Sequence, residues 1–369
     1  MNKQPVKVLH ICQRDDSATG GAVRVAVEYI TRLKHYGVEA HCLFLYGKPN
    51  DFQPQLAPFA HYLDIRNSNE VWKFTRLNKF IRKFAPDIIH HHDGLMWSNL
   101  ITSIHPNYKK ISHAHLSATV YTSPIKGKVA AWIRRRSTNA LVCITDFIQA
   151  DYVNSGRYKQ ETTHVISNGV DANRFQPVST ELKRAAKKSF GWDTDTPVIG
   201  YVGRLDCQTK GVDDFIRVLA ELPENIKGLI VGDGPDRAEL VALAQQYCLS
   251  DRIRFTGNLS EPYQAYCAMD VFCSTSHYEG FGLSVIEAMS CEIPVVGFVC
   301  EGGINEVLNE TTGDVVDRDP LKMAKAISNI LDAGLSQSKL DNIRAKIKTD
   351  YCWEKNAEKL ATLYQDIIQ

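Results

Sequence analysis

The chain has 369 residues, which is enough for two domains because a single domain typically has about 100–200 residues. Hydrophobic residues make up 44% of the chain and charged residues 23%, a composition that excludes intrinsic disorder as a general description. Lysine and arginine (43) nearly balance aspartate and glutamate (42), which disfavours a nucleic-acid binder that depends on bulk positive charge. We therefore expect no nucleic-acid partner.

The sequence predicts a reduced, cytoplasmic protein. No run approaches the roughly 18–20 uninterrupted apolar residues that a membrane span needs. The first apolar run, Val6–Ile11, is too short and too polar for the core of a signal peptide and predicts a strand. The ten cysteines show neither a CxxC pair nor zinc-type spacing, and several lie in apolar runs, where a thiol behaves as a small hydrophobe.

In the first half of the chain, short apolar runs alternate with amphipathic stretches. The runs that predict buried strands are Val6–Ile11, Glu39–Tyr46, Asp87–His90, Lys110–His113 and Ala140–Ile144. The stretches with apolar residues at helical spacing are Ala22–Tyr36, Glu70–Phe84 and Lys126–Arg136. Strands and helices that alternate in this way predict a parallel sheet covered on both faces.

The alternation pauses at the turn signal Ser167–Asp171 and then starts again after a polar, mostly helical segment. The second set of predicted strands is Pro197–Val202, Gly228–Val231, Ile253–Phe255, Val271–Ser274 and Pro294–Val299. The predicted helices are Asp213–Glu221, Arg237–Tyr247, Ser284–Met289, Ile304–Leu308, Leu321–Leu331 and Trp353–Ile368.

We therefore predict two doubly wound, Rossmann-like α/β domains, residues 1–175 and 176–352. The C-terminal helix, residues 353–369, is expected to pack back on the first domain. Ligands of open α/β sheets bind beyond the carboxyl ends of the strands, so two facing sheets predict a working cleft between the domains.

Two glycine-containing loops are candidates for phosphate binding, and a third is either a tight turn or part of the ligand side of the second sheet. Gly20-Gly21 precedes the first predicted helix, where backbone N–H groups and the helix N-terminus favour an anion; an ordinary turn is the alternative. Gly203-Arg204-Leu205, followed by Lys210-Gly211, places two cations between a strand and a helix and predicts a diphosphate site; a solvated loop is the alternative. Gly232-Asp233-Gly234-Pro235 lacks the third glycine of a dinucleotide fingerprint, so a dehydrogenase is disfavoured.

Two carboxylates frame the segment Glu279–Glu287. The glycines at 280 and 282 place Glu279 on a loop and Glu287 on the following helix, so both carboxylates can face one cleft. Because a carboxylate on a buried helix needs hydrogen-bond donors, paired hydroxyls of a ligand are one partner for Glu287 and a structural ion pair is the other.

Histidines cluster in two predicted strands. His90, His91 and His92 are consecutive, and neighbouring side chains on a strand point to opposite faces, so all three cannot converge on one ion. We therefore expect no metal there. His113 and His115 share a face if their strand continues. They are then candidates to bind a ligand at the edge of the cleft, and hydrogen bonds to the backbone are the alternative.

Other charged motifs are weaker candidates. The acidic pairs Asp193/Asp195 and Asp317/Asp319 lie before a strand and in a predicted surface turn, respectively, so neither indicates a metal-bound sugar nucleotide. The predicted basic helix at residues 126–136 can lie on an anionic membrane surface, although a solvated helix face is the simpler interpretation. Peripheral contact with the inner membrane surface is therefore one of two interpretations that this segment leaves open.

Together these motifs resemble the retaining, nucleotide-sugar-dependent glycosyltransferases of the GT-B group called family 4 or group 1. The matching segments, in the order of the family, are Gly20-Gly21, Asn168–Asp171 with Phe175, Gly203–Leu205 with Lys210-Gly211, Gly232–Pro235, Phe255–Gly257, Glu279–Glu287, Pro294–Val296, and Gly302-Gly303 with Glu306. The resemblance covers most of the chain and implies the GT-B fold, two Rossmann-like domains facing across a cleft.

The resemblance also implies roles. Arg204 and Lys210 would bind the donor diphosphate, Glu287 the ribose hydroxyls and Glu279 the donor sugar. Backbone donors would come from Gly280, Phe281, Gly282 and Leu283, the base would lie near Gly234 and Gly257, and Gly20 and Gly21 would lie near the phosphates or the acceptor. A histidine at the position of His113 or His115 is typical beside the reacting centre. The group is generally metal-independent, so no cofactor is expected beyond the nucleotide-sugar substrate.

The chain departs from the family pattern at Glu292, where a glycine is usual after the segment Ala288–Cys291. If the backbone needs a positive φ there, glutamate adds strain.

The prediction is thus a glycosyltransferase that acts on a glycan or lipid-linked acceptor. The alternatives are a GT-B sugar-nucleotide epimerase, which would interconvert the donor without an acceptor, and a binding protein without turnover.

Overall fold

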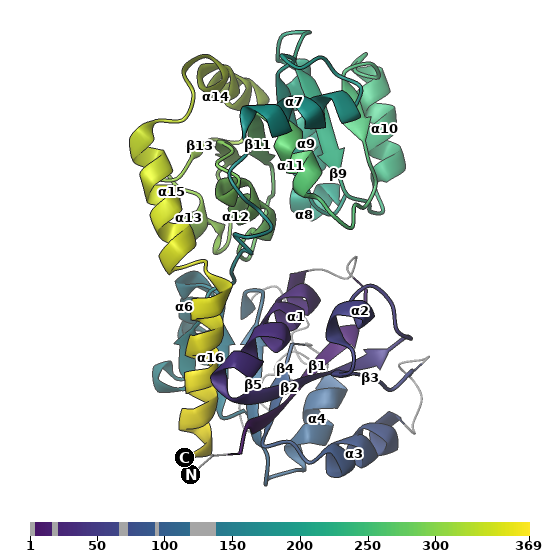
Figure 1. Ribbon diagram of the computed structural model, residues 1–369, viewed down its shortest axis with the longest axis vertical. Helices are drawn as coiled ribbons and strands as arrows, with labels where there is room; N and C mark the ends of the chain where they lie inside the picture. Colours follow the sequence, from purple (N-terminus) through teal and green to yellow (C-terminus); the bar gives the residue numbers. More distant parts are fainter. Residues whose placement is uncertain (1–3, 17–20, 66–72, 93–95, 119–137) are drawn as a thin grey trace. The chain divides into compact units, whose positions relative to one another are not determined.

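The computed structural model describes residues 4–16, 21–65, 73–92, 96–118 and 138–369 (Figure 1). The chain forms two compact units. Unit 1 comprises Met1–Asn168 together with Trp353–Gln369, and unit 2 comprises Gly169–Cys352. The chain changes unit at the Asn168-Gly169 turn rather than after residue 175, and the last helix belongs to unit 1.

Unit 1 is a seven-stranded sheet in the order β3-β2-β1-β4-β5-β6-β7. Its strands are β1 Val6–Arg14, β2 Val38–Tyr46, β3 Ala60–Tyr62, β4 Ile88–His91, β5 Lys109–Ala114, β6 Ala140–Cys143 and β7 Thr163–Val165. Its helices are α1 Gly21–Leu33, α2 Gln53–Leu56, α3 Lys73–Phe84, α4 Met96–Ser103, α6 Asp146–Asn154 and α16 Trp353–Ile368, with short 3-10 turns at Lys34–Tyr36 and Gln160–Thr162. All the strand pairs described are parallel.

Side-chain alternation assigns the two faces of this sheet to different helices. Leu9 and Ile11 of β1 pack with Leu77 of α3 and Ile101 of α4 in one apolar cluster. The side chains between them on β1, including His10, therefore point to the other face. That face receives α1 and α16, which pack against each other (Figure 1).

Unit 2 is a six-stranded parallel sheet in the order β10-β9-β8-β11-β12-β13. Its strands are β8 Val198–Val202, β9 Lys227–Val231, β10 Ile253–Phe255, β11 Val271–Ser274, β12 Val295–Phe298 and β13 Asp314–Val316. Its helices are α7 Thr180–Ser189, α8 Cys207–Lys210, α9 Val212–Ala220, α10 Arg237–Gln246, α11 Tyr263–Ala268, α12 Leu283–Ser290, α13 Ile304–Val307, α14 Pro320–Ala333 and α15 Gln337–Thr349.

Each sheet reverses its strand order once. The reversal lies between β1 and β4 in unit 1 and between β8 and β11 in unit 2. In a doubly wound sheet the loops that leave the carboxyl ends of these two strands separate and open a crevice for ligands. Ligand sites are therefore expected at the loops after β1, β4, β8 and β11.

Glu292 has a left-handed backbone, with a φ of 58°. The strain that the sequence suggested at this position is therefore present, and α12 still ends at Ser290 as a glycine-terminated helix would. The Glu292 carboxylate accepts two hydrogen bonds from the Arg344 guanidinium, at 2.6 and 3.1 Å. This bidentate ion pair offsets part of the cost of the backbone conformation.

Among the described residues, no helix is both long and apolar enough to cross a membrane. The predicted basic helix at 126–136 lies outside the described residues, as does Gly20.

Candidate active site

The loops after β8 and β11 meet around Lys210. The Nζ of Lys210 lies 2.5 Å from the Oε2 of Glu279, and both side chains are about three-quarters buried, with exposed fractions of 26% and 21%. The hydroxyl of Thr275 donates to the carbonyl of Lys210 at 3.1 Å. The predicted cation and the predicted carboxylate are therefore in direct contact, although 69 residues separate them in the chain.

Arg204 differs from Lys210 in its surroundings. Its side chain is exposed, and its guanidinium has no ion-pair or hydrogen-bond partner among the described residues. Its carbonyl accepts a hydrogen bond from the Tyr201 hydroxyl at 3.0 Å, which fixes the backbone of the loop. The loop thus holds a cation whose donors remain available to a ligand.

Two glycines of the second predicted motif allow the loops after β8 and β9 to touch. A Cβ on Gly232 would lie 1.9 Å from the carbonyl oxygen of Gly203, and one on Gly234 would lie 2.3 Å from that of Leu205. The backbone N–H of Leu205 also donates to the carbonyl of Asp233 at 3.0 Å. These glycines therefore permit the close backbone approach that positions Arg204.

The Glu279–Glu287 segment divides as predicted between a loop and a helix. Glu279 precedes α12, and Gly282 caps this helix with a φ of 90°. The first backbone N–H groups of α12 have no acceptor within the helix, so they point into the region before it. Phe281 is buried and packs edge-on against Tyr351, while Gly280 is buried and Leu283 is partly exposed. The loop is thus anchored by an aromatic side chain.

Glu287 lies on the buried side of α12, with 3% of its surface exposed. Its Oε2 accepts a hydrogen bond from the Tyr266 hydroxyl at 2.8 Å. The hydroxyl of Tyr266, a neutral donor, therefore helps to hold Glu287 in place.

Arg318 supports this site but was missed by the sequence analysis, which placed it in a surface turn. Its guanidinium donates to the carbonyls of Thr275 at 3.0 Å and Ser276 at 2.6 Å and pairs with Asp214 at 2.7 Å. The flanking carboxylates are engaged elsewhere, since Asp317 pairs with Lys322 and Asp319 caps α14. The sequence offers only a weak signal for this role of Arg318, namely an arginine between two aspartates after a strand.

In unit 1, five buried or nearly buried histidines share one face of the sheet at the reversal of strand order. They are His10 on β1, His90 and His92 on and after β4, and His113 and His115 on and after β5. The rings of His113 and His115 stack with centroids 4.5 Å apart, so the two do share a face. His91 points to the opposite face, where its Nε2 lies 3.0 Å from the Thr102 hydroxyl.

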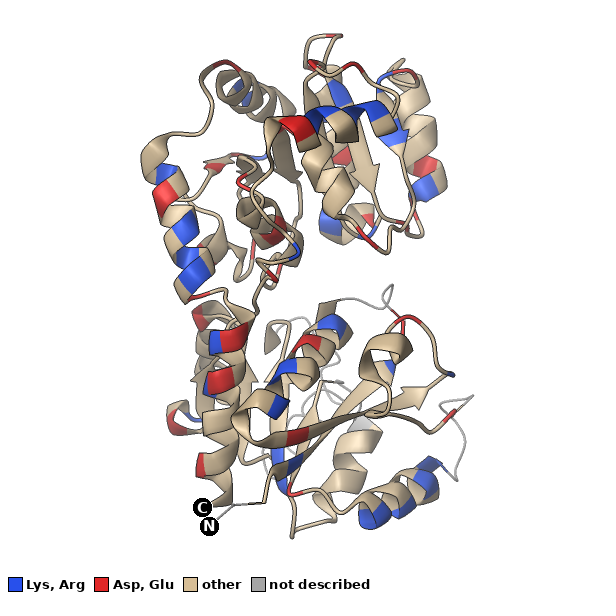
Figure 2. Ribbon diagram, in the orientation of Figure 1, with Lys and Arg blue, Asp and Glu red and all other residues tan. Residues whose placement is uncertain are grey.

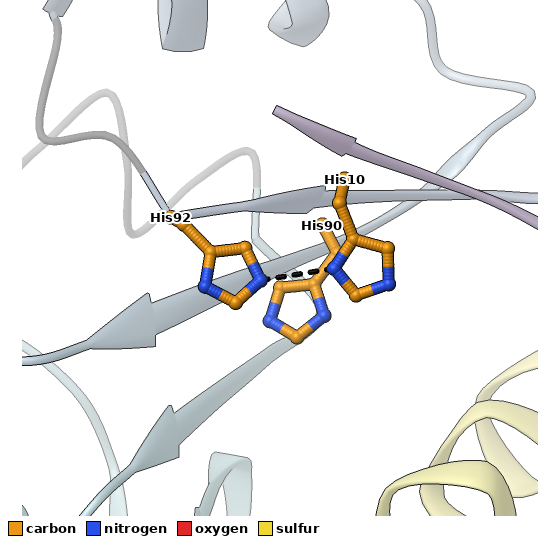
Figure 3. Close-up of side chains that lie close together, drawn as sticks. All are labelled: His10, His90 and His92. Carbon is orange, nitrogen blue, oxygen red and sulfur yellow. Dashed lines mark hydrogen bonds between the residues drawn. The ribbon is translucent and has the colours of Figure 1, made fainter. Parts of the chain in front are cut away.

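The three consecutive histidines His90–His92 do not converge, but two of them meet a histidine of another strand. The alternation that turns His91 away is correct, but it brings His90 and His92 together with His10 of the neighbouring strand (Figure 3). Their ring nitrogens lie within 4.8 Å of one another, as do those of His92, His113 and His115. The spacing of residues along one strand does not show which side chains come together across neighbouring strands.

Burial dominates the protonation of these histidines. Loss of solvation lowers the pKa of His10 and that of His115 to about 3, and in His10 the nearby His41 adds to the effect. Burial and neighbouring imidazoles also hold the pKa values of His90, His92 and His113 well below the usual range. The five rings are therefore neutral at physiological pH.

Two family models match the chain in sequence order. The model described as Glycosyltransferase Family 4 matches residues 19–174, and the model described as Glycosyl transferases group 1 matches residues 183–349. The chain belongs to the group 1, family 4 glycosyltransferases. It is a nucleotide-sugar-dependent glycosyltransferase of the GT-B fold.

Named relatives and solved structures resemble the chain over most of its length. It is 28% identical to alpha-D-kanosaminyltransferase of Streptomyces kanamyceticus over 281 residues, covering 73% of this chain and 70% of that protein. It is 29% identical to the lipopolysaccharide core biosynthesis mannosyltransferase LpsB of Rhizobium meliloti, covering 68% and 72%. The structure of Anabaena Alr3699/HepE in complex with UDP and glucose superposes with a TM-score of 0.85 at 19% identity, over 98% and 99% of the two chains, and this likeness concerns the fold.

Gly211 offers a test of how this glycosyltransferase holds Lys210. Gly211 has a φ of 57°, and a Cβ there would lie 2.3 Å from the carbonyl oxygen of Thr275. Gly257 has a φ of 74° with nothing within 4 Å of such a Cβ. We expect Gly257→Ala to cost about 1 kcal/mol of unfolding free energy and Gly211→Ala clearly more, because only the latter adds a clash with the backbone.

Urea unfolding of the two variants measures this difference. Equal losses in both variants would contradict a tight contact between the Lys210 loop and Thr275.

Proposed function

We propose that this glycosyltransferase transfers a sugar from a nucleoside-diphosphate donor to a glycan or lipid-linked acceptor, with retention of configuration, in cell-surface polysaccharide or lipopolysaccharide biosynthesis. The support from relatives is their printed activities, which include LpsB and the capsular polysaccharide biosynthesis glycosyltransferase CapM of Staphylococcus aureus, 26% identical over 62% of each chain. The observation that carries the proposal is the contact between Lys210 and Glu279 beside the unpaired Arg204.

The donor diphosphate is assigned to Arg204 and Lys210. Arg204 supplies a planar set of N–H donors that suits phosphate oxygens, and Lys210 supplies a compact charge. Without a donor, Glu279 neutralises Lys210 and keeps its ammonium in one position. When the diphosphate arrives, it adds an anion to this cation, so Lys210 does not need to reorganise.

The sugar and the ribose are assigned to the two carboxylates. Glu279 lies beside the diphosphate cation and would contact the donor sugar together with the backbone donors of the Gly280–Leu283 loop. Glu287, fixed by Tyr266, would accept hydrogen bonds from the ribose hydroxyls. The base would lie near Gly234 and Gly257, whose loops follow β9 and β10.

The chemistry requires stabilisation of a departing diphosphate. Breaking the anomeric bond builds positive charge on the sugar and negative charge on the diphosphate, which the two cations stabilise; one well-placed donor is worth about 3–4 kcal/mol. Retention would follow if the acceptor attacks the face that the diphosphate leaves and a diphosphate oxygen takes the acceptor proton. We propose no metal ion for this reaction, and we assign His113 or His115 to the reacting centre.

Contact with a membrane is a further part of the proposal. Helix α3 carries five lysines and arginines and no acidic residue, and the ribbon in Figure 2 is coloured blue at these basic positions. Large apolar side chains are exposed nearby, with Phe74 on α3 at 38%, Leu100 on α4 at 43% and Ile104 after it at 62%. Basic residues around exposed apolar side chains favour an anionic lipid surface, where a lipid-linked acceptor would be found.

Removal of the Lys210 ammonium tests the donor site. We expect Lys210→Ala to weaken nucleotide-sugar binding about 10- to 100-fold, because a charge-assisted contact to the diphosphate is lost. A thermal-shift panel of nucleotide sugars measures this, since a bound ligand stabilises the folded protein by mass action. Lys187→Ala is a control that removes a lysine paired with Asp270 in the same unit; equal affinities of all three proteins would refute the assignment.

Glu287 is tested against its structural partner. We expect Glu287→Gln to weaken donor binding about tenfold, because an amide accepts hydrogen bonds from ribose less strongly than a carboxylate does. Tyr266→Phe removes the other member of the 2.8 Å hydrogen bond and is expected to lower stability more than affinity. If both variants lose stability equally and neither changes the dissociation constant of the donor, then Glu287 is structural.

The membrane proposal predicts weaker vesicle binding after loss of cations on α3. We expect the double variant Arg82→Gln/Lys83→Gln to bind anionic phospholipid vesicles about 30-fold more weakly, since each cation near the surface contributes about 1 kcal/mol. The matched control is Arg184→Gln/Lys188→Gln, which removes two exposed cations from α7. Sedimentation with the vesicles measures binding, and an equal loss in both double variants would argue against a membrane site on α3.

A further inference from the structure

The histidine cluster of unit 1 includes a tyrosine from the far end of the chain. Tyr364 on α16 is fully buried, and its hydroxyl lies 2.6 Å from the Nδ1 of His90. The Nε2 of His90 in turn lies 3.2 Å from the Nδ1 of His113. His113 is thus connected through the imidazole of His90 to the hydroxyl of Tyr364, which lies 251 positions after His113 in the sequence (364 − 113).

A second arm leaves the same hydroxyl. It lies 3.4 Å from the Nε2 of His10, the longest contact of the set. The Nδ1 of His10 lies 2.9 Å from the Nε2 of His92, which is the dashed line in Figure 3. The Nδ1 of His92 lies 3.1 Å from the Nε2 of His115. Six side chains therefore form one chain of hydrogen bonds from His113 to His115.

Neutral imidazoles impose a direction on such a chain. Each neutral ring has one N–H donor and one bare nitrogen, so a ring that donates on one side must accept on the other. The burial of these rings keeps them neutral, and burial likewise keeps the proton on the Tyr364 hydroxyl. The position of one proton in the chain therefore fixes the position of all the others.

The contact between Tyr364 and His90 selects the direction. Its length of 2.6 Å is typical of an O–H donor, whereas N–H donors to oxygen usually lie at about 2.9–3.0 Å. With Tyr364 donating, His90 carries its proton on Nε2 and donates to His113. His113 then accepts at Nδ1 and carries its own proton on Nε2.

We propose that His90 and Tyr364 are positioning residues that hold His113 as the neutral Nε2–H tautomer, so that His113 donates a hydrogen bond to an oxygen atom of the substrate rather than accepting a proton from it. This inference rests on the proposed function, in which His113 or His115 serves the reacting centre. The Nε2 of His113 is buried and has no partner among the described residues, so its N–H is the free end of the chain.

The same chain assigns a complementary role to His115. The Tyr364 oxygen accepts from Nε2 of His10, so the Nδ1 of His10 is bare and accepts from Nε2 of His92. The Nδ1 of His92 is then bare in turn, so His115 carries its proton on Nε2 and donates it to His92. The Nδ1 of His115 is then a bare acceptor beside the ring of His113. The stacked pair at the carboxyl end of β5 thus offers one donor and one acceptor, which matches a sugar oxygen and a neighbouring hydroxyl.

A metal ion is the competing occupant of this cluster. Among the described residues, the two groups that could hold an ion contain histidines alone, so a divalent cation would bring its full charge into a buried site. It would also take nitrogens that already satisfy one another, such as Nδ1 of His10 and Nε2 of His92. The hydrogen-bond chain accounts for these contacts without an ion.

Nitrogen-15 NMR of the histidine rings tests the proposal, and it needs neither substrate nor turnover. In the wild-type protein we expect the proton of His113 on Nε2, unchanged between pH 6 and 8. In Tyr364→Phe, which retains the ring but removes the hydroxyl, we expect His113 to become a mixture of both tautomers. Tyr29→Phe is the matched control: it removes a hydroxyl from another buried tyrosine, one that contacts the His113 ring but donates to the carbonyl of Ser167.

Kinetics give the second measurement. We expect Tyr364→Phe to lower kcat about tenfold with a smaller change in KM, and Tyr29→Phe to leave both nearly unchanged. His90→Gln retains a donor and an acceptor and is expected to recover more activity than His90→Leu.

Three results would overturn the proposal: a proton on Nδ1 of His113 in the wild type, an unchanged tautomer in Tyr364→Phe, or a stoichiometric transition metal in the purified protein. If instead no sugar is transferred from any nucleotide sugar but the His113 tautomer responds to Tyr364→Phe as expected, the proposed function fails and the hydrogen-bond chain stands.

Discussion

The parallel direction of the strands is the constraint on which both candidate sites depend. Because every described strand pair in each sheet is parallel, the loops that leave the carboxyl ends all emerge at one edge. In unit 2 this edge brings the Lys210 loop to the loop that begins at Thr275, and in unit 1 it collects histidines from three adjacent strands. Residues far apart in the sequence thus become neighbours, although no local sequence pattern predicts these contacts.

The central strands of both sheets could be predicted from the sequence because most of their residues are apolar. The strands β1, β2, β8 and β11 lie within a few residues of the predicted ranges. The strands that were missed, β3, β7 and β13, have three residues each and lie at the edges of their sheets, where burial is partial and no apolar run develops. Helix α15 was missed for a related reason, since Ile343 is the one residue of it that is buried.

The candidate donor site was predictable as a set of residues but not as a set of contacts. Glycine loops and isolated charges identified Arg204, Lys210, Glu279 and Glu287, and for Glu287 the signal was that a carboxylate on a buried helix is costly unless it has a partner. Which partner each one meets depends on tertiary packing: Glu279 meets Lys210, and Glu287 meets the hydroxyl of Tyr266. Arg318 and Tyr364 could not be found this way, since Arg318 lies in a charged loop before α14 that looks like a surface turn and Tyr364 lies within α16 among ordinary core positions.

The last helix gives the two units different histories during synthesis. Unit 2 is continuous in sequence, so all of it is synthesised before the residues of α16. Unit 1 is interrupted by unit 2 and needs α16, because α16 packs on the face of its sheet that carries the buried histidines. Until α16 packs there, this face lacks the helix that supplies Tyr364 and helps to bury its imidazoles. The interior of the first unit therefore cannot exclude water at these histidines until a segment that follows the whole second unit has been synthesised, whereas the second unit is built from one continuous stretch of chain.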